Sequence, residues 1–249
     1  MVSKFIEFPL VSIVTVVYNG ENTLERTIIS VINQTYKNIE YIIIDGGSID
    51  NTLSIVNKYK HHISTIISEK DKGIYDAMNK GISLANGSLV GIINSDDWYE
   101  IDAVEKIVSS FLSNTNFDVY YGVLRFLALD GNTSAIQGIS HENLKNSMIS
   151  HPTCFVQLNT YRKHGIFNTN YRIAADYEFI LRIYLKGCNF YFIEEILANF
   201  SHGGVSTVNN YDLKSEILSI KLYHSLISTS NYFLHKIYLF FRYKIFYGL

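Results

Sequence analysis

Apolar and polar positions in the first half of the chain alternate in a way that predicts strands followed by helices. Residues 11–17 are mostly β-branched, and residues 22–34 place apolar side chains at the spacing of one helical face. Asn22 and Glu25 have the spacing of a capping box at the start of that helix. Further strand and helix pairs are expected at 39–44 and 51–59, at 63–68 and 75–85, and at 88–93 and 102–111. Four such units predict an α/β fold with a mostly parallel sheet and helices on both faces.

The regular alternation stops after residue 122. Residues 123–128 and 133–137 flank an Asp130-Gly131 turn signal, which predicts a β-hairpin. Residues 171–187 have helical spacing. The residues after 122 are therefore expected to add α+β structure to the sheet. We expect one domain over residues 1–206, with halves 10–122 and 123–206, followed by a C-terminal helical segment at 207–249.

Polar clusters follow the four predicted strands of the first half. They are residues 18–20, 45–48, 69–73 and 94–97. Because the carboxyl ends of parallel strands meet at one edge of a sheet, these clusters are expected to lie together. Any α/β protein needs polar turns at this edge, but the clusters hold more carboxylates and asparagines than turning requires. They predict a ligand site.

The last of these clusters reads Asn94-Ser95-Asp96-Asp97 and directly follows an apolar run. Two adjacent carboxylates at a strand end are hard oxygen ligands that suit Mg²⁺ or Mn²⁺ together with a substrate diphosphate. The alternative is that Asp96 or Asp97 caps the helix that begins near Ile101, since Asp is a preferred N-cap residue. The pattern leaves both interpretations open.

Composition narrows the possible partners. The 249 residues carry a net charge of −2, whereas a general nucleic-acid binder has a basic excess, so no nucleic-acid partner is expected. Residues 1–9 contain no apolar stretch of signal-peptide length, which favours a cytoplasmic location. Cys154 and Cys188 lie far apart without metal-type spacing, and we expect them to be small buried hydrophobic residues.

Four stretches, 11–19, 45–52, 69–81 and 94–97, resemble the motifs of family 2 glycosyltransferases. The resemblance is to the bacterial branch that builds O-antigen, capsule and colanic-acid repeat units. It is specific over residues 10–112 and continues more weakly to about residue 206. It implies a GT-A fold with a Rossmann-like sheet, a nucleotide-sugar donor, Mn²⁺ or Mg²⁺, and inversion at the anomeric carbon.

The resemblance also assigns roles to the residues that match its motifs. Asp97 is the expected metal ligand within a DXD-type motif. The expected nucleotide-sugar contacts are Thr15, Tyr18, Asn19, Asp45, Asp71, Ser95 and Asp96. Within this set, Asp45 and Asp71 are expected near the base or ribose. The family commonly has Asp-Asp-Gly-Ser where this chain has Gly46 in the second place, which leaves Asp45 as the sole acidic contact of that turn.

Inverting transfer needs a carboxylate base for the acceptor hydroxyl. Residues 174–178, Ala-Ala-Asp-Tyr-Glu, resemble the acidic helix-start motif of the family, so Asp176 is the expected base. The family often has Glu-Asp here, and Ala175 is a departure from that pattern. Without the resemblance, Asp176 would read as an acid in the first turn of a helix, where the helix dipole favours it.

Further residues are candidates for contacts with the acceptor or the diphosphate. His151, in a matching block at 151–155, is expected to face a sugar, or else to be structural. His202 lies in a glycine-bearing loop at 200–206 that resembles a donor-closing loop, so it is expected near the diphosphate or the metal, although the glycines also suit a simple turn. Arg125 and Arg182 are candidate diphosphate partners or surface charges.

The C-terminal segment is basic and aromatic, with no acidic residue from 217 to 249. Charges interrupt its apolar stretches well before the roughly 20 residues that span a bilayer. Such a composition suits the headgroup zone of an anionic membrane, which favours peripheral contact with the inner face of the cell membrane. The alternative is a helix pair that packs against the catalytic domain and turns its Lys and Arg outward.

These features predict a metal-dependent inverting transferase that adds one hexose from a UDP-sugar to a polyprenyl-diphosphate-linked saccharide. Within the branch, β-linked glucose or galactose is expected, a β-1,3 linkage being one option. Processive relatives carry Gln-x-x-Arg-Trp and transmembrane helices, whereas Trp98 is the sole tryptophan here, so single-sugar addition is favoured. The alternative is a non-catalytic subunit that binds a nucleotide sugar or a lipid within a polysaccharide assembly complex.

Overall fold

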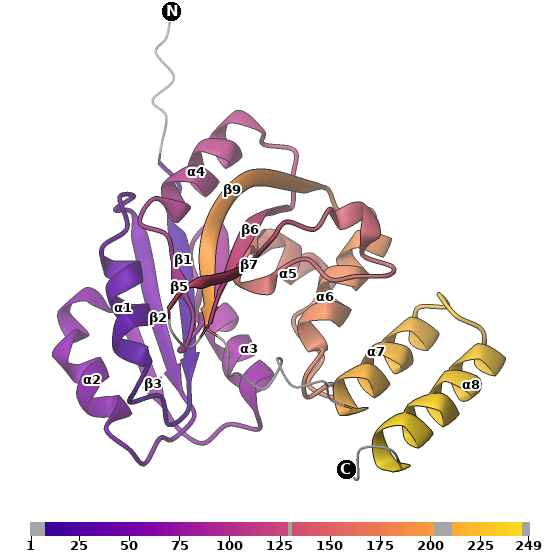
Figure 1. The fold of residues 1–249 in the computed structure, drawn as a ribbon. Helices are drawn as coiled ribbons and strands as arrows, with labels where there is room; N and C mark the ends of the chain where they lie inside the picture. The colour runs from indigo at the N-terminus through magenta and orange to yellow at the C-terminus, as the bar shows by residue number, and fades with distance from the viewer. Residues whose placement is uncertain (1–7, 129–130, 202–210, 246–249) are drawn as a thin grey trace, which may run out of the picture.

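The computed structural model describes residues 8–128, 131–201 and 211–245 (Figure 1). Within these residues, nine strands form one sheet in the order β3-β2-β1-β4-β8-β6-β9-β5, with β7 paired to β6. The strands are β1 (Val11–Val17), β2 (Ile39–Asp45), β3 (Thr65–Ser68), β4 (Leu89–Asn94), β5 (Trp98–Tyr99), β6 (Val119–Leu127), β7 (Thr133–Gln137), β8 (Phe155–Gln157) and β9 (Phe190–Ser201). The helices are α1 (Leu24–Ile32), α2 (Thr52–Lys58), α3 (Ile74–Leu84), α4 (Ala103–Ser113), α5 (Leu158–His164), α6 (Ala175–Leu185), α7 (Tyr211–Tyr223) and α8 (Thr229–Phe240).

The first four strands are parallel, as the alternation of the sequence predicts. β1 pairs with β2 on one side and with β4 on the other, and β2 pairs with β3. Their carboxyl ends align, with Val17 opposite Asp45 and Asp45 opposite Ser68. The strand order reverses between β1 and β4, which makes a topological switch point where α/β sheets bind ligands. The prediction that the four polar clusters share one edge of the sheet is confirmed.

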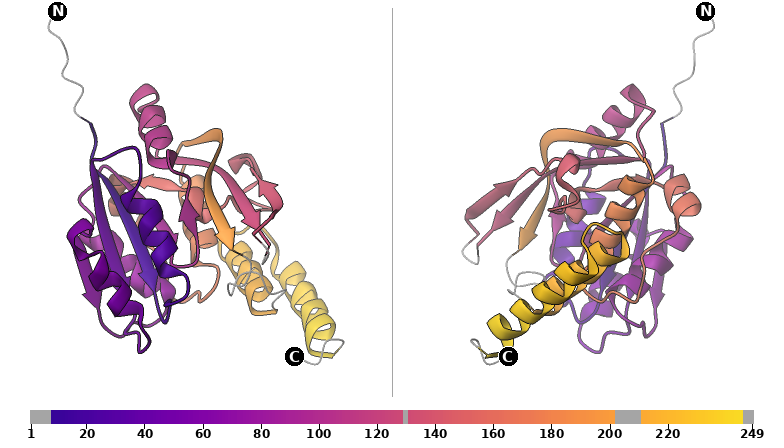
Figure 2. Two further views of the ribbon diagram at one scale, coloured as in Figure 1. Left: turned by 60° about the vertical axis from the view of Figure 1, so that its left-hand side comes forward. Right: turned by 90° about the vertical axis from the view of Figure 1, so that its right-hand side faces the viewer.

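Alternate residues of β1 pack into two different cores. Val14 and Val16 lie in a cluster with residues of α3, α5 and α6, whereas Ile13 and Val17 lie in a cluster with residues of α1, α2 and α4. Figures 1 and 2 show these helices on opposite faces of the sheet. Each buried branched side chain contributes about 1.5–3 kcal/mol. The prediction of helices on both faces is confirmed.

The second half extends the sheet with mixed strand directions. β8 runs antiparallel to β4 and β6, whereas β9 runs parallel to β6. β6 and β7 form the predicted antiparallel pair, although β6 begins at Val119, earlier than expected. α6 begins at Ala175 and not at residue 171, because residues 171–174 form a loop. Both cysteines are free, Cys154 being buried and Cys188 partly exposed.

One expectation and one alternative interpretation about helix starts are wrong. α1 begins at Leu24 after Thr23, without a side-chain cap, so Asn22 and Glu25 form no capping box. The Glu25 carboxylate instead lies 2.6 Å from Lys58 Nζ of α2, an ion pair that competes with capping. Neither aspartate of the 96–97 pair caps α4, because β5 intervenes and Asp102 precedes the helix.

The C-terminal segment forms two helices that lie side by side, with α7 next to α6 (Figure 1). Ile220 of α7 is fully buried, and Leu239 and Tyr243 of the following stretch are also buried. Many other apolar side chains of α8 and its continuation are exposed: Phe233, Leu234, Ile237, Tyr238, Phe240 and Phe241. In the part of the chain that the structure describes, no helix is long and apolar enough to cross a bilayer.

Candidate functional site

The end of β1 is tied to the turn after β2 through Asn19. This residue adopts a left-handed backbone with φ of 51°, a conformation that Asn tolerates better than most residues. Its backbone N–H donates to Ser48 Oγ at 2.8 Å, and its side-chain Oδ1 accepts from Ile49 N at 3.0 Å. The neighbouring Tyr18 is largely exposed. The predicted contacts Tyr18 and Asn19 therefore lie at an ordered, accessible strand end.

The turn after β4 lies against the same strand end. A Cβ placed on Gly20 would be 3.3 Å from Ser95 Oγ, so the 18–20 and 94–97 clusters are in close approach. Gly20 N also donates to Thr52 Oγ1 at the start of α2, at 2.8 Å. The structure thus brings Ser95 together with Tyr18 and Asn19 at the switch point.

Thr15 and Asp45 are also placed in this region, but both are fully buried. Thr15 Oγ1 lies 3.1 Å from the Tyr41 hydroxyl. The Asp45 carboxylate accepts hydrogen bonds from Ser48 N at 3.2 Å and from Ser68 Oγ at 2.6 Å. These contacts support the strand ends from within, and direct contact with a ligand would require both side chains to exchange partners.

The third polar cluster reaches the turn after β2 through Asp71. A Cβ placed on Gly46 would collide with the Asp71 carboxylate, which therefore lies against the backbone of that turn. Asp71 Oδ1 also accepts from Gly73 N at 2.9 Å. The departure at Gly46 leaves room for Asp71, so the turn has an acidic neighbour from another loop besides Asp45.

Asp97 is the most unusual group at this edge of the sheet. It is fully buried, and no hydrogen bond of normal geometry reaches its carboxylate from a described residue, although the Ser201 backbone and the Asn94 side chain lie close enough to lower its pKa in part. Burial, and then the charge of Asp96, raise the pKa of Asp97 well above its ordinary value. Burial likewise raises the pKa of Asp96. The Asn94 Oδ1 and Tyr99 hydroxyl atoms nearby in sequence are also buried without a described partner.

α1 holds this aspartate pair in place. Thr27 Oγ1 donates to Asp97 O at 2.6 Å, and the Arg26 guanidinium donates to Asp96 O at 2.9 Å. Arg26 also lies over the Trp98 ring, 3.6 Å from its centroid. Burial lowers the pKa of Arg26, against the attraction of Asp97 and Asp96. Sequence reasoning missed Arg26, although a basic residue in the first turn of a helix runs against the dipole preference.

These residues fit a divalent ion held only in part by protein. In the described ranges, no group of three or more His, Cys, Asp or Glu residues could bind a metal. However, Mg²⁺ and Mn²⁺ bind commonly through one or two carboxylates together with substrate phosphates and water. Asp97, whose two buried oxygens receive no hydrogen bond of normal geometry from the described residues, and the adjacent Asp96 supply that smaller set.

Asp176 lies in the first turn of α6, half-buried. The Tyr75 hydroxyl is 2.9 Å from Asp176 Oδ1 and 2.7 Å from Ile173 O, and Tyr177 N donates to the same Asp176 oxygen at 2.9 Å. Burial, and then the charge of Asp176, raise the pKa of Tyr75, which keeps the hydroxyl protonated. No described residue donates to Asp176 Oδ2. Tyr75 lies within the 69–81 motif, but no sequence pattern points to its contact with Asp176, which lies 101 positions away.

His151 lies near Asp176. Its ring packs edge-on against Phe167, with centroids 5.9 Å apart. Burial lowers the pKa of His151, and the charge of Asp176 opposes this effect only in part, so the imidazole is neutral near neutral pH. The structure therefore brings together the 151–155 and 174–178 blocks.

The remaining candidates either contact other protein side chains or lie outside the described residues. Arg125 is 2.9 Å from Glu100 Oε1 and 3.2 Å from Asn199 Oδ1, in a network that joins β5, β6 and β9. Arg182 Nε is 3.0 Å from Glu178 Oε1 within α6. His202 lies outside the described residues.

Comparison with known proteins gives matches over most of the chain. The family model described as Glycosyl transferase family 2 matches residues 12–170. The chondroitin synthase of Pasteurella multocida strain Pm70 is 31% identical over 235 residues, which cover 90% of this chain and 24% of that protein. The chondroitin synthase of Escherichia coli is 32% identical over 216 residues, covering 84% and 31%. The hyaluronan synthase of Pasteurella multocida is 34% identical over 181 residues, covering 70% and 19%. This chain therefore spans less than a third of the length of these three relatives.

Solved structures share the fold. Residues 1–349 of S. aureus TarS in complex with UDP superpose with a TM-score of 0.68 at 18% identity, covering 95% of this chain and 72% of that one. The mannosyltransferase PcManGT from Pyrobaculum calidifontis, in complex with GDP-Man and Mn²⁺, gives a TM-score of 0.68 at 13% identity, covering 90% and 66%. At these identities the likeness is one of fold alone, and it confirms the predicted GT-A fold.

Proposed function

Because the chain belongs to glycosyl transferase family 2, we propose that it adds a single hexose from a UDP-sugar to a polyprenyl-diphosphate-linked saccharide, with inversion at the anomeric carbon. The setting is synthesis of a bacterial surface polysaccharide such as O-antigen. Relatives that are named as chondroitin and hyaluronan synthases support a role in polysaccharide synthesis. The proposed hexose is β-linked glucose or galactose, and the proposed linkage is β-1,3.

The observation that carries this proposal is Asp97. A fully buried carboxylate that receives no hydrogen bond of normal geometry from the described residues is costly, and a ligand that completes it would account for that cost. Asp97, together with Asp96, would hold Mn²⁺ or Mg²⁺, which when bound stabilises the negative charge that develops on the leaving diphosphate. The position of Asp97 beyond β4, beside the end of β1, is where this fold class binds ligands.

The donor would lie across the ends of β1, β2 and β4. Tyr18 and Asn19 offer an exposed ring and a fixed turn, and Ser95 approaches them from the β4 side. Asp71 is available for a ribose hydroxyl or the base, while Thr15 and Asp45 hold the strand ends from below. Arg125 and His202 remain proposed diphosphate contacts, and Arg125 would have to share its guanidinium with Glu100.

Asp176 is the proposed base. Its Oδ1 is held by Tyr75 and Tyr177 N, which leaves Oδ2 to accept the proton of the acceptor hydroxyl. The acceptor oxygen then bonds to the anomeric carbon from the face opposite the diphosphate, and the bond between that carbon and the diphosphate oxygen breaks. His151, neutral and close to Asp176, is a candidate for a hydrogen bond to a sugar hydroxyl.

The C-terminal helices are the proposed membrane contact. α8 exposes Phe233, Leu234 and Ile237 on a segment without acidic residues, a combination that favours an anionic bilayer surface. Contact with the inner face of the cell membrane would bring the site to a lipid-linked acceptor. The proposed location is cytoplasmic and peripheral.

A transfer assay tests the proposal. The full chain is incubated with Mn²⁺, with UDP-glucose, UDP-galactose or UDP-N-acetylglucosamine, and with polyprenyl-diphosphate-linked saccharides extracted from bacterial membranes. UDP release and a lipid-linked product heavier by one sugar are expected with one donor, and Asp176→Asn should lower both by about 10²- to 10⁴-fold. Glu194→Gln, which removes an exposed carboxylate from β9, is the matched control. Binding of a donor without transfer to any acceptor would support the non-catalytic interpretation instead.

A further inference from the structure

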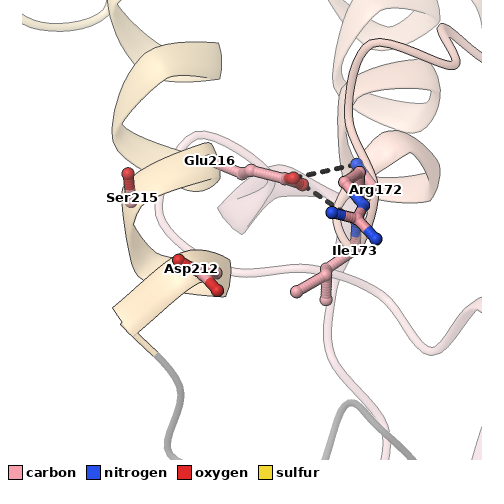
Figure 3. Close-up of a pocket in the computed structure, with 5 residues that line it drawn as sticks. All are labelled: Arg172, Ile173, Asp212, Ser215 and Glu216. Atoms are coloured by element: carbon pink, nitrogen blue, oxygen red, sulfur yellow. Dashed lines mark hydrogen bonds between the residues drawn. The ribbon is translucent and has the colours of Figure 1, made fainter. Parts of the chain in front are cut away.

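Glu216 of α7 reaches across to the loop that precedes α6. Its Oε1 accepts from Arg172 N at 2.8 Å, and its Oε2 accepts from Ile173 N at 3.0 Å and from Ala174 N at 2.9 Å. Figure 3 shows the carboxylate pointing from α7 toward residues 172 and 173, across a cavity of about 530 Å³. One side chain from the C-terminal segment therefore binds three consecutive backbone amides.

This contact fixes the backbone that leads into α6: Glu216 binds the amide of the N-cap residue Ala174 and the amides of the two residues before it. The first N–H groups at a helix start have no partner within the helix. Ser, Thr, Asp or Asn usually supplies one from the N-cap position, but the N-cap residue of α6 is Ala174, whose side chain cannot accept. A carboxylate that accepts from backbone amides forms charge-assisted bonds, which are stronger than neutral ones. The start of α6 is thus held by a residue that is 42 positions away from Ala174.

The same loop leads directly into the first turn of α6, which carries Asp176. Both backbone polar groups of Ile173 have partners: its N–H donates to Glu216, and its carbonyl lies 2.7 Å from the Tyr75 hydroxyl. That hydroxyl is also 2.9 Å from Asp176 Oδ1. A shift of residues 172–174 would therefore move both the backbone that leads into Asp176 and the Ile173 carbonyl, which competes with the Asp176 carboxylate for the Tyr75 hydroxyl.

A second contact fixes α7 along α6. His224 Nε2, at the end of α7, lies 3.3 Å from Glu178 Oε1, and Glu178 is buried. Ile220, between Glu216 and His224 in the sequence, is fully buried. α7 is therefore anchored at two points on the helix that bears Asp176.

We propose that Glu216 is a positioning residue for Asp176, so that α7 of the C-terminal segment is part of the catalytic machinery and not only a connection to α8. This inference rests on the proposed function of Asp176 as the base. Glu216 acts through the 172–174 backbone and does not touch the reacting atoms.

Hydrogen exchange tests the positioning without any need for turnover. In Glu216→Gln the neutral amide keeps the side-chain volume but loses one acceptor oxygen and the charge. We expect faster amide exchange over residues 172–178 than in the wild type, and unchanged exchange there in the control Glu194→Gln. Equal protection of these amides in the wild type and in Glu216→Gln would overturn the inference, whether or not the chain transfers sugar.

Kinetics then test the link to Asp176. A small misplacement of a catalytic group lowers kcat by about 10- to 100-fold, and this is expected for Glu216→Gln, with the KM for the UDP-sugar changed by less than about twofold. If Glu216 acts through Asp176, the same change should lower the residual activity of Asp176→Asn by no more than about twofold. Equal losses in both backgrounds, or a change confined to KM, would contradict the proposal. Absence of transfer by the wild type would instead count against the proposed function.

Discussion

Replacing Asp97 with Asn should stabilise the metal-free protein while it removes the proposed metal ligand. Asp97 is fully buried, its two oxygens receive no hydrogen bond of normal geometry from the described residues, and burial raises its pKa well above the ordinary value. Asn has nearly the same shape but no charge. Its amide can also donate toward buried acceptors, and Asn94 Oδ1 and the Tyr99 hydroxyl lack described partners. The wild type thus carries a functional group at the expense of stability.

The size and pH dependence of this effect follow from the raised pKa. An unsatisfied buried group costs about 1–3 kcal/mol, and a charged one costs more. Because the folded state holds the proton of Asp97 more tightly than the unfolded state does, wild-type stability falls as pH rises from the unfolded pKa of about 3.9 toward the folded pKa. Asp97→Asn has no carboxyl group to ionise at this position, so its stability does not fall in this way. The stability difference should be near zero at about pH 4 and grow by up to about 1.4 kcal/mol for each pH unit within that window.

Urea unfolding in the presence of EDTA, at several pH values between 4 and 8, measures this difference. At pH 8, the free energy of unfolding of Asp97→Asn should exceed that of the wild type by about 1–3 kcal/mol or more. Glu194→Gln, which neutralises an exposed carboxylate, should match the wild type throughout. A destabilised Asp97→Asn at pH 8, or a difference that does not vary with pH, would refute the reasoning.

Four further outcomes are expected. Asp176→Asn should lower kcat by about 10²- to 10⁴-fold in initial-rate assays, with UDP affinity unchanged by calorimetry; a loss of UDP binding would contradict the role as base. Tyr75→Phe removes a buried hydroxyl that has two acceptors, so urea unfolding should show a loss of about 1–2 kcal/mol, and equal stability would argue against the contact. Arg26→Ala should expose the sole tryptophan, Trp98, and shift its fluorescence to longer wavelength, with a loss of about 0.5–1 kcal/mol in stability. Phe233→Glu should reduce cosedimentation with anionic vesicles, whereas Ile136→Glu, at an exposed position of β7, should not. Equal effects of the two changes would argue against a membrane face on α8.

The sequence predicted the central sheet because strands covered on both faces appear as continuous apolar runs, while the helices between them bury one face with a helical period. The parallel strands, their helices and the common edge of the polar clusters all depend on that pattern. The position of Asp97 beyond β4 follows from the same pattern. Its complete burial does not, since that depends on how α1 and the end of β9 pack over the turn.

Contacts between distant segments leave no local pattern. Tyr75 and Asp176 are 101 positions apart, and Glu216 binds amides 42 to 44 positions away. The failed capping box at Asn22 shows the converse, because Glu25 has the right spacing but binds Lys58 of the next helix instead. Local sequence determines which contacts a residue such as Glu25 can form, and tertiary packing determines which of them it forms.

Calorimetric titration of UDP into the full chain, with Mn²⁺ and with EDTA, tests the central claim most directly. The account predicts that the wild type and Asp176→Asn bind UDP with similar affinity when Mn²⁺ is present and far more weakly in EDTA. Asp97→Asn, although folded and more stable, should bind weakly under both conditions. Tight, Mn²⁺-dependent binding of UDP by Asp97→Asn, or no binding by the wild type, would contradict the placement of the donor site at the ends of β1 and β4.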